Sequence, residues 1–338
     1  MKIGIVYDLR ADYLQQGYSP EQTAEFDSIE TIAAIDAALK EQGYQTERVG
    51  NIKQLAAALV NGRRWDLVFN IAEGMHGIAR EAQVPALLDA YNIPYVFSDA
   101  VTMAVTLDKA MAKRIVRDHG IPTAPFMVVE RMSDLDAFHL AFPVFAKPLA
   151  EGTGKGINAA SRVDTLSDLK SACKQLLAIH RQPVLIESFL PGREFTVGII
   201  GNGDDTKVMG VMEITLRNNA ERNAYSFENK EYYEDRVDFK IVEDAEARQA
   251  AETALRAWRA LRCQDSARFD LRSDNQSVPQ FLEVNPIAGL HPVRSDLVIL
   301  MRLQGYSYQE CLQKIMTAAI QRLGLVKSKA GVVKAVCE

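Results

Sequence analysis

The sequence lacks the features that mark several classes of protein. It has no block rich in lysine and arginine, and its formal net charge is −5, which is unlike a nucleic-acid or membrane-surface binder. No eighteen consecutive residues are apolar, and the apolar run before Asp8 is too short for a signal-peptide core. We therefore expect a cytoplasmic protein that acts on small molecules, with no nucleic-acid or membrane partner.

Cysteine is also scarce. The four cysteines lie far apart, with no Cys-x-x-Cys pair and no histidine at zinc-ligand spacing; they are Cys173, Cys263, Cys311 and Cys337. We expect reduced, mostly structural thiols. The remaining composition, 48% hydrophobic and 25% charged over 338 residues, is typical of a globular protein with two or three domains.

The first hundred residues alternate strand-like and helix-like segments, which predicts a parallel α/β layer. The predicted strands are 2–7, 44–49, 66–71 and 94–97, and the predicted helices are 28–42, 52–61 and 80–91. Asp27 and Glu30 predict a capping box for the first helix. No G-x-G-x-x-G turn follows the first strand, which argues against dinucleotide binding.

The rest of the chain predicts one helix over 99–119, a strand-helix-strand pattern to residue 190, and then strands of antiparallel character mixed with helices. Residues 216–236 are polar and weakly periodic. A loop of that length inside a compact domain is usually a functional lid or disordered, and its interleaved aromatic residues favour a lid. The tail after Leu325 has no clear pattern and is expected to be loosely held.

Polar residues interrupt the hydrophobic strand FLEVNP near its end. Residues two apart in a strand share a face, so Glu283 and Asn285 lie on one face, as do Arg268 and Asp270. A hairpin centred near residues 276 and 277 would place Asp270 opposite Glu283 and Arg268 opposite Asn285. Facing carboxylates repel unless a cation lies between them, and oxygen donors suit Mg²⁺. The alternative is an exposed sheet face on which Arg268 pairs with the acids.

A glycine-rich loop follows the strand FPVFAKP. Lys147 ends that strand, and the backbone amides of the loop could approach phosphate oxygens. The loop is not a Walker A motif, because Leu149 stands where that motif needs glycine and Lys155 is followed by Gly156. A plain surface hairpin is the alternative.

Two further carboxylates lie near strand ends. Glu187 ends one apolar strand and Glu194 begins the next. Carboxylates at such positions could accept hydrogen bonds from adenine or ribose. Solvated acids at a sheet edge are the alternative.

Taken together, these segments resemble the ATP-grasp superfamily, and most closely the D-alanine:D-alanine ligase family. The motifs occur in order from Phe97 to Ser295: SDAVTMAVTLDKAMAKRIV, FPVFAKPLAEGTGKGI, VLIESFLPGREFTVGI, ENK, ARFDL and FLEVNPIAGL. A weaker similarity surrounds AEFDSIETI. The resemblance implies an ATP-grasp fold behind a Rossmann-like N-terminal domain. The implied regions are an N-terminal α/β domain (1–98), a central ATP-binding subdomain (99–190), a C-terminal metal-binding subdomain (191–325) and a tail (326–338).

The resemblance also implies a reaction. ATP phosphorylates the carboxylate of a first amino acid, and the amine of a second attacks the acylphosphate to form a peptide bond. It implies ATP and Mg²⁺ as cofactors, with Mn²⁺ as an alternative metal, amino acids as substrates, and a homodimer as one expected assembly.

The resemblance assigns roles residue by residue. Lys109 and Lys147 would hold phosphates, Glu187 the adenine and Glu194 the ribose, while Lys230 would reach the γ-phosphate and Arg268 with the Gly289 amide would stabilise an oxyanion. The implied residues are Arg268, Gly289 and Lys230 for catalysis; Lys109, Lys147, Glu151, Gly152, Thr153, Gly154, Glu187, Ser188, Phe189, Leu190, Glu194 and Lys230 for ATP; Asp270, Glu283 and Asn285 for the metal; and Glu25, Glu73, Arg294 and Ser295 for the substrates.

Several substrate-side positions depart from the family pattern. Glu73 stands where the family usually has histidine, Thr153 and Gly154 replace a Ser-Ser pair, and Lys230 is followed by glutamate rather than tyrosine. The residues implied for ATP match the family pattern, and several residues implied for the amino acids differ from it. Amino acids of L configuration, side chains other than alanine, and a peptide acceptor all stay open, as does a non-catalytic ATP-binding protein that keeps the fold.

The residues after Gly289 also differ from the family pattern. Arg294 and Ser295 follow Gly289 by five and six positions, where the family holds the carboxylate of the second amino acid. Arginine binds carboxylates with two parallel hydrogen bonds. The alternative is an arginine at a helix start that answers Asp296.

Overall fold

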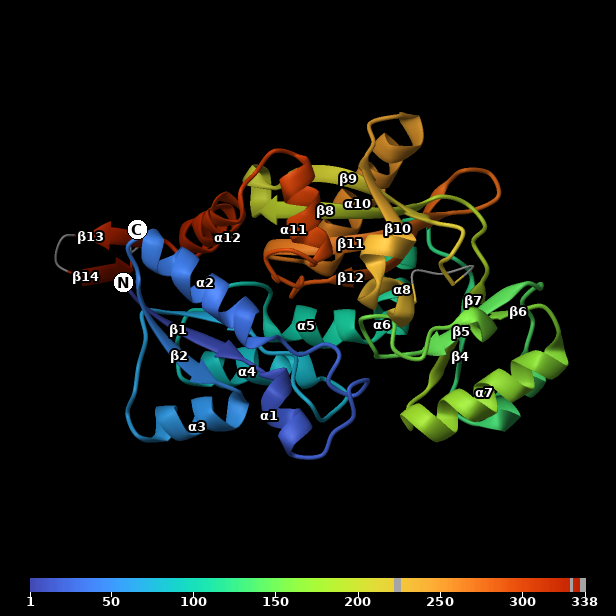
Figure 1. Ribbon diagram of the computed structural model, residues 1–338, viewed down its shortest axis with the longest axis horizontal. Coiled ribbons are helices and arrows are strands. Elements are labelled where there is room, and N and C mark those ends of the chain that lie inside the picture. The colour runs from blue at the N-terminus through green and yellow to red at the C-terminus, as the bar shows by residue number, and fades with distance from the viewer. Residues whose placement is uncertain (222–225, 329–330, 335–338) are drawn as a thin grey trace.

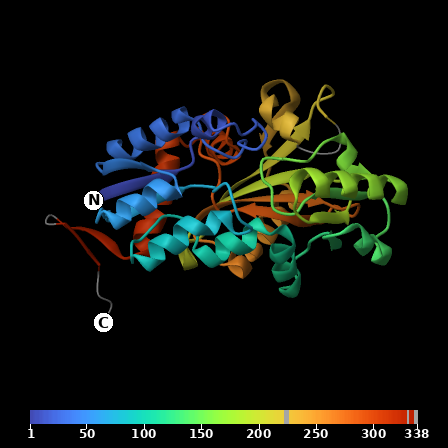
Figure 2. The same cartoon turned by 90° about the horizontal axis from the view of Figure 1, so that it is seen from below.

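The computed structural model describes residues 1–221, 226–328 and 331–334 (Figure 1). These residues form a parallel three-stranded sheet, two antiparallel sheets of four and five strands, and a two-stranded hairpin. Helices cover the sheets, which confirms the expected α/β class. In Figures 1 and 2 the N-terminal layer (blue) and the central sheet (green) lie at opposite ends, with the five-stranded sheet between them. None of the described helices is long and apolar enough to cross a membrane.

The N-terminal layer is the expected parallel sheet, with strand order β2-β1-β3. Its elements are β1 (Lys2–Tyr7), α1 (Arg10–Gln15), α2 (Ile29–Glu41), β2 (Gln45–Gly50), α3 (Ile52–Val60), β3 (Leu67–Ile71), η1 (Arg80–Ala82) and α4 (Gln83–Ala90). Helix α1 was not predicted, and the expected fourth strand is reduced to one bridge between Tyr95 and Val68. Ser28, whose side chain accepts from the Thr31 amide, caps α2, so the Asp27 capping-box prediction is wrong.

The single helix predicted over 99–119 is two helices, α5 (Ala100–Leu107) and α6 (Lys109–Asp118). The break lies at Asp108, which has an extended backbone and caps the Met111 amide at 2.9 Å. The break places Lys109 in the first turn of α6. From there its Nζ donates to the Glu151 carbonyl oxygen at 2.5 Å, so the break brings this lysine to the glycine-rich loop.

The central sheet has the order β4-β7-β5-β6, and α7 packs on it. Its elements are β4 (Phe126–Val129), η2 (Met132–Ala137), β5 (Val144–Pro148), η3 (Ala159–Ser161), β6 (Arg162–Val163), α7 (Leu166–His180) and β7 (Val184–Ser188). The 3-10 helix η2 follows β4, where the strand-helix-strand pattern predicted a regular helix. The loop between β5 and β6 is the glycine-rich segment, and it faces the N-terminal layer.

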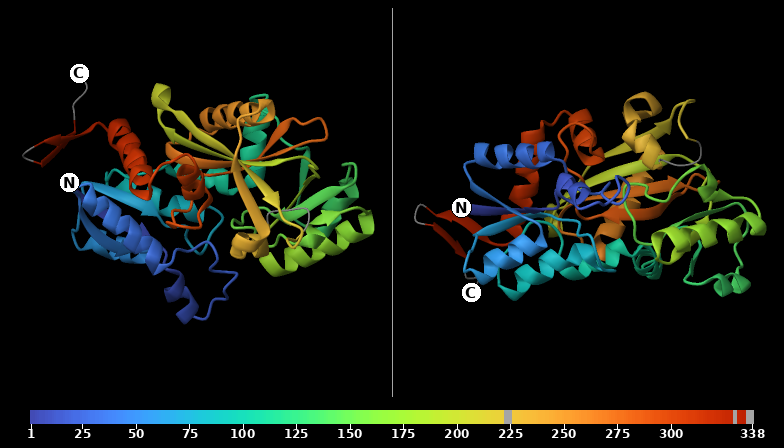
Figure 3. Two further views of the ribbon diagram at one scale, coloured as in Figure 1. Left: turned by 45° about the horizontal axis from the view of Figure 1, so that its top comes forward. Right: turned by 60° about the horizontal axis from the view of Figure 1, so that its bottom comes forward.

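The C-terminal sheet has the order β10-β9-β8-β11-β12. Its elements are β8 (Glu194–Gly201), η4 (Gly203–Asp205), β9 (Lys207–Leu216), β10 (Val237–Ile241), α10 (Ala245–Leu261), β11 (Asp265–Ser273), β12 (Pro279–Asn285), α11 (Asp296–Leu303) and α12 (Tyr308–Arg322). One face packs against α10 and the other against α11 and α12. Helix α12 also packs on α2, so these C-terminal helices join the sheet to the N-terminal layer (Figure 3).

Two segments differ from their expected form. The segment 216–236 contains two short helices, α8 (Phe227–Glu231) and α9 (Tyr233–Arg236), rather than an irregular loop, and residues 222–225 lie outside the described part. The tail forms a hairpin of β13 (Leu325–Ser328) and β14 (Gly331–Lys334), where no strand was expected.

The cysteines of the described part agree with the sequence. The three cysteines there are free and buried, and Cys337 lies outside it. Burial raises the pKa of the Cys173 thiol to about 11. These thiols are therefore protonated and structural.

Candidate active site

Two adjacent cavities lie where the N-terminal layer, the glycine-rich loop and the β11–β12 pair meet. The smaller cavity is lined by β5, β7, β8 and the strand-end segment 188–190, and the larger by the N-terminal layer, β12 and the loop after it. They share the side chains of Glu151, Lys230 and Glu283. Every residue that the sequence resemblance assigned to a site lines one of the two cavities.

A buried group of three charges lies at the floor of the smaller cavity. Lys147 Nζ and Lys113 Nζ lie 2.8 and 3.0 Å from the Glu187 carboxylate. Lys113 Nζ also donates to Thr123 Oγ1 at 2.8 Å and to the Phe281 carbonyl oxygen at 3.1 Å. Burial by itself would raise the pKa of Glu187, but the two lysines hold it below its ordinary value. The sequence motifs gave Lys113 no role, although it lies one helical turn after Lys109 on α6.

Charged and aromatic side chains line the other end of the smaller cavity. Glu194 Oε2 lies 3.5 Å from Arg272 Nη1. The guanidinium groups of Arg162 and Arg272 lie 4.8 and 5.3 Å from the centroid of the Phe189 ring. Burial raises the pKa of Glu194. This end therefore offers an aromatic surface and a carboxylate, which suits a base and a sugar hydroxyl.

The β11–β12 pair has the predicted register. Asp270 lies opposite Glu283 and Arg268 opposite Asn285, with a bulge directly after Asp270. Arg268 Nη2 donates to Asp270 Oδ2 at 3.0 Å, and Lys109 Nζ lies 3.4 Å from Glu283 Oε2. Burial opposes the ionisation of Glu283, but Lys109, together with further cations, lowers its pKa to about 2. Glu283 is therefore ionised, and both acids contact a cation.

The donor set of this strand pair fits a hard divalent cation. Two carboxylates and one amide supply oxygen atoms only, which is the set that Mg²⁺ prefers. Asn285 Nδ2 lies 3.4 Å from Asp270 Oδ2, so the amide is within reach of the same centre. Within the described part of the chain no three His, Cys, Asp or Glu side chains are grouped closely enough to hold a metal, so a site here would depend on the amide oxygen of Asn285 as a third donor.

An ion-pair network ties the glycine-rich loop to the N-terminal layer. Glu25 accepts from the Gly152 amide, and its Oε2 lies 2.8 Å from Lys155 Nζ and 3.2 Å from Arg80 Nη2. Lys155 Nζ also lies 2.6 Å from Glu151 Oε2. Arg80 was not singled out from the sequence and Lys155 was given no role, because their partner Glu25 is distant along the chain. The network holds the loop over the junction of the two cavities.

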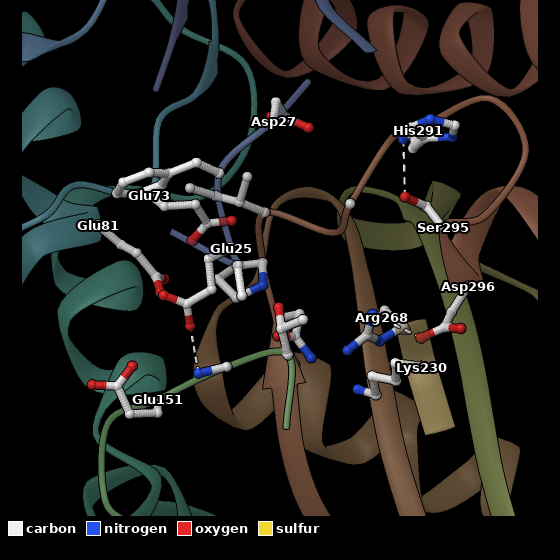
Figure 4. Close-up of a pocket in the computed structure, with 18 of the residues that line it drawn as sticks. Glu25, Asp27, Glu73, Glu81, Glu151, Lys230, Arg268, His291, Ser295 and Asp296 are labelled. Atoms are coloured by element: carbon white, nitrogen blue, oxygen red, sulfur yellow. Dashed lines mark hydrogen bonds and ion pairs between the residues drawn. The ribbon is translucent and has the colours of Figure 1, made fainter. Parts of the chain in front are cut away.

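More acids line the larger cavity on the same side (Figure 4). They are Asp27, Glu73 and Glu81, of which only Glu73 was assigned from the sequence. Burial raises the pKa values of Asp27 and Glu81 to about 7 each. Burial and the neighbouring charge of Glu81 raise the pKa of Glu73 well above its ordinary value. Ionisation of these acids is therefore disfavoured, because nearby positive charge does not offset their burial.

The opposite wall of the larger cavity is formed by the loop after β12 and the start of α11 (Figure 4). Arg268 Nη1 lies 3.1 Å from Asp296 Oδ2, and Ser295 Oγ accepts from the His291 amide at 2.9 Å. A side chain at Gly289 would place its Cβ 2.8 Å from Ser295 Oγ, so Ser295 would have to shift to admit it. Arg294 lies at the exposed rim. The role of Asp296 as a partner of Arg268 was missed.

Comparison with known proteins identifies the family. The family model described as "D-ala D-ala ligase C-terminus" matches residues 115–317. A D-alanine–D-alanine ligase of Aquifex aeolicus is 30% identical over 311 residues, which cover 91% of this chain and 100% of that protein. The chain belongs to the D-alanine–D-alanine ligase family. Members of this family are ATP-dependent ligases that form C–N bonds and use a divalent metal.

Two further similarities cover most of the chain. The Sinorhizobium fredii protein y4sG is 31% identical over 301 residues, covering 86% of this chain and 87% of that protein. The crystal structure of the D-alanine–D-alanine ligase from Bacillus anthracis complexed with ATP superposes with a TM-score of 0.74 at 22% identity, covering 95% of this chain and 98% of that one. That likeness confirms the expected ATP-grasp fold.

Proposed function

We propose that this chain uses ATP to activate the carboxylate of one amino acid as an acylphosphate and then joins it to the amine of a second. The observation that carries the proposal is the shared wall of the two cavities. Glu151, Lys230 and Glu283 line both cavities, so the phosphate end of a nucleotide in the smaller cavity would open directly into the larger one. Phosphoryl transfer needs this adjacency between the γ-phosphate and the acceptor carboxylate.

The smaller cavity is the proposed ATP site. Lys109, Lys147 and Lys230 would hold phosphate oxygens, since three cations offset the charge of the triphosphate. The other proposed ATP residues are Glu151, Gly152, Thr153 and Gly154 in the glycine-rich loop, Glu187, Ser188, Phe189 and Leu190 around the adenine, and Glu194 at the ribose.

Asp270, Glu283 and Asn285 would hold Mg²⁺, with Mn²⁺ as an alternative. When bound, a divalent cation there offsets the charge of the phosphate oxygens. Asp270 and Asp296 hold Arg268 in place. Burial alone would lower the pKa of its guanidinium, but the nearby carboxylates raise it above its ordinary value. Its guanidinium and the Gly289 amide would stabilise the oxyanion formed when the amine attacks the acylphosphate.

The larger cavity is the proposed amino-acid site. Glu25 and Glu73 would lie on the side of the first amino acid, and Arg294 and Ser295 would bind the carboxylate of the second. Relatives named for D-alanine support a D-alanine:D-alanine ligase-like reaction. Glu73 in place of the usual histidine supports a second candidate, which is the same reaction with other amino acids or a peptide acceptor. A non-catalytic role is disfavoured because the metal ligands and phosphate lysines are all present.

Domain division, location and assembly are parts of the same proposal. We propose domains at 1–98, 99–190 and 191–325 with a tail at 326–338, although α11 and α12 share a hydrophobic core with the N-terminal layer. A cytoplasmic location and a homodimer complete it. Light scattering after size-exclusion chromatography tests the dimer.

The test of the function is ADP release. The protein is mixed with ATP, Mg²⁺ and a panel of D- and L-amino acids, and the product mass is measured. We expect ADP release only with amino acids present, and a product whose mass equals the sum of the two amino acids less one water. ADP release without amino acids at the same rate, or no release with any member of the panel, contradicts the proposal.

A further inference from the structure

The acidic wall of the larger cavity holds two carboxyl groups that the described part of the chain does not pair. Glu25, Glu73 and Glu81 reach it from three separate segments of the N-terminal layer (Figure 4). The charge of Glu25 is met within the protein, because its carboxylate contacts Arg80, Lys155 and the Gly152 amide. Glu25 is therefore occupied in holding the glycine-rich loop.

Glu73 and Glu81 differ from Glu25 in this respect. Within the described part of the chain, neither carboxylate accepts a hydrogen bond or forms an ion pair. Both are partly buried, and each is near the other and near Glu25. Buried carboxylates without partners are costly, so two of them in a cavity indicate a place where a ligand supplies positive charge.

The position of these acids relates them to the first amino acid. The charges of Lys109 and Lys155 act to lower the pKa of Glu81, so these lysines are near it. Both lysines contact Glu151 of the glycine-rich loop. The side of the cavity that holds Ser295 lies across from this wall (Figure 4). An amino acid whose carboxylate lies between Arg268 and the phosphate lysines would thus extend its other end toward Glu73 and Glu81.

We propose that Glu73 and Glu81 select a first amino acid with a cationic side chain, so that its two positive groups meet the two unpartnered carboxylates. The inference rests on the proposed function, since it names the substrate class of the same cavity. An ammonium or guanidinium group gains charge-assisted hydrogen bonds there. An apolar side chain would leave the two carboxylates desolvated and unpaired, which penalises binding.

The test compares amino acids that match in shape and differ in charge. Lysine with norleucine and arginine with citrulline are used, each as D and L forms, and alanine is included. ADP release and product mass give kcat/KM for each, and calorimetry with Mg²⁺ and a non-hydrolysable ATP analogue gives affinity. We expect the cationic member of each pair to be favoured at least about tenfold, from the strength of a charge-assisted hydrogen bond.

Variants of Glu73 and Glu81 test whether these residues cause the preference for a cationic side chain. Glu73→Gln and Glu81→Gln should each reduce the lysine-to-norleucine ratio of kcat/KM at least about tenfold, because each removes one charge. Glu41→Gln, at an exposed acid on α2 outside the cavity, is the matched control and should leave that ratio unchanged. Should a glutamine variant fail to fold, Glu81→Asp keeps the charge and should retain the preference for lysine.

The outcomes separate the inference from the proposed function. If norleucine, citrulline or alanine serves as well as the cationic amino acids, the inference is overturned while the ligase function stands. If no amino acid releases ADP, the proposed function fails and calorimetry decides the inference. Tighter binding of lysine than of norleucine then supports it, and equal binding overturns it.

Discussion

The buried charges at the floor of the smaller cavity allow a prediction of stability. Glu187→Gln removes the carboxylate that lies 3.0 Å from Lys113 Nζ and 2.8 Å from Lys147 Nζ, where the three side chains are at most 6% exposed. Breaking a buried ion pair by removing one partner costs about 3–5 kcal/mol, because the remaining charge is left in a medium that solvates it poorly. Here two lysines lose their partner, so we expect Glu187→Gln to cost at least about 3 kcal/mol.

A matched variant sharpens this prediction. Lys113→Met removes the surplus cation and leaves Lys147 paired with Glu187. The Phe281 carbonyl oxygen still accepts from Thr123 Oγ1 at 2.8 Å. We therefore expect Lys113→Met to cost less than half as much as Glu187→Gln. The assay is urea unfolding of the nucleotide-free protein, followed by circular dichroism and tryptophan fluorescence. A cost below about 1 kcal/mol for Glu187→Gln, or the reverse order of the two variants, would refute the reasoning.

Three further predictions concern the site. Glu283→Gln should keep the fold, seen by circular dichroism, and reduce kcat at least about a hundredfold, because a carboxylate near the phosphates supports several kcal/mol of charge stabilisation; near-normal rates at saturating Mg²⁺ would remove it from the metal site. Arg294→Ala should raise the KM for the second amino acid strongly and leave the KM for ATP nearly unchanged; an unchanged acceptor KM would exclude the clamp. Burial raises the pKa of Glu81 from 4.5 to about 7 in the folded protein. Between pH 4.5 and pH 7 the folded state therefore binds more protons than the unfolded state. The free energy of unfolding should fall by up to about 3 kcal/mol as the pH rises across this range. Glu81→Gln should therefore stabilise the protein at pH 8 relative to pH 5 in urea titrations, and an equal effect at both pH values would contradict this.

Local patterns predicted the strand pair well. The period-two alternation around Glu283, and a polar turn of the right length, were enough to fix the pairing of Asp270 with Glu283. The bulge after Asp270 was not predictable, because it changes no side-chain pattern that the sequence displays. The break between α5 and α6 was also missed, since the apolar periodicity runs through Asp108 and the capping role of that residue is visible only from its backbone.

Contacts between distant segments could not be predicted in the same way. One ion-pair network joins Glu25, Arg80 and Lys155. Arg80 lies 55 residues after Glu25, and Lys155 lies 75 residues after Arg80, so no local pattern predicts the network. No local pattern distinguishes Lys113 from other helix lysines, because its partner Glu187 lies far along the chain. The motifs reveal the departures from the family pattern at Glu73 and in the glycine-rich loop. Glu81 belongs to no motif, and only the structure shows that it lines the same cavity.

The central claim is that ATP activates an amino-acid carboxylate as an acylphosphate in the larger cavity. The direct test uses the amino acid that gives the fastest ADP release, labelled with oxygen-18 in its carboxylate, and measures the mass of the inorganic phosphate after turnover. The account predicts that one labelled oxygen passes to inorganic phosphate for each amide bond formed. Amide formation with unlabelled phosphate, or with the label in AMP, would contradict it.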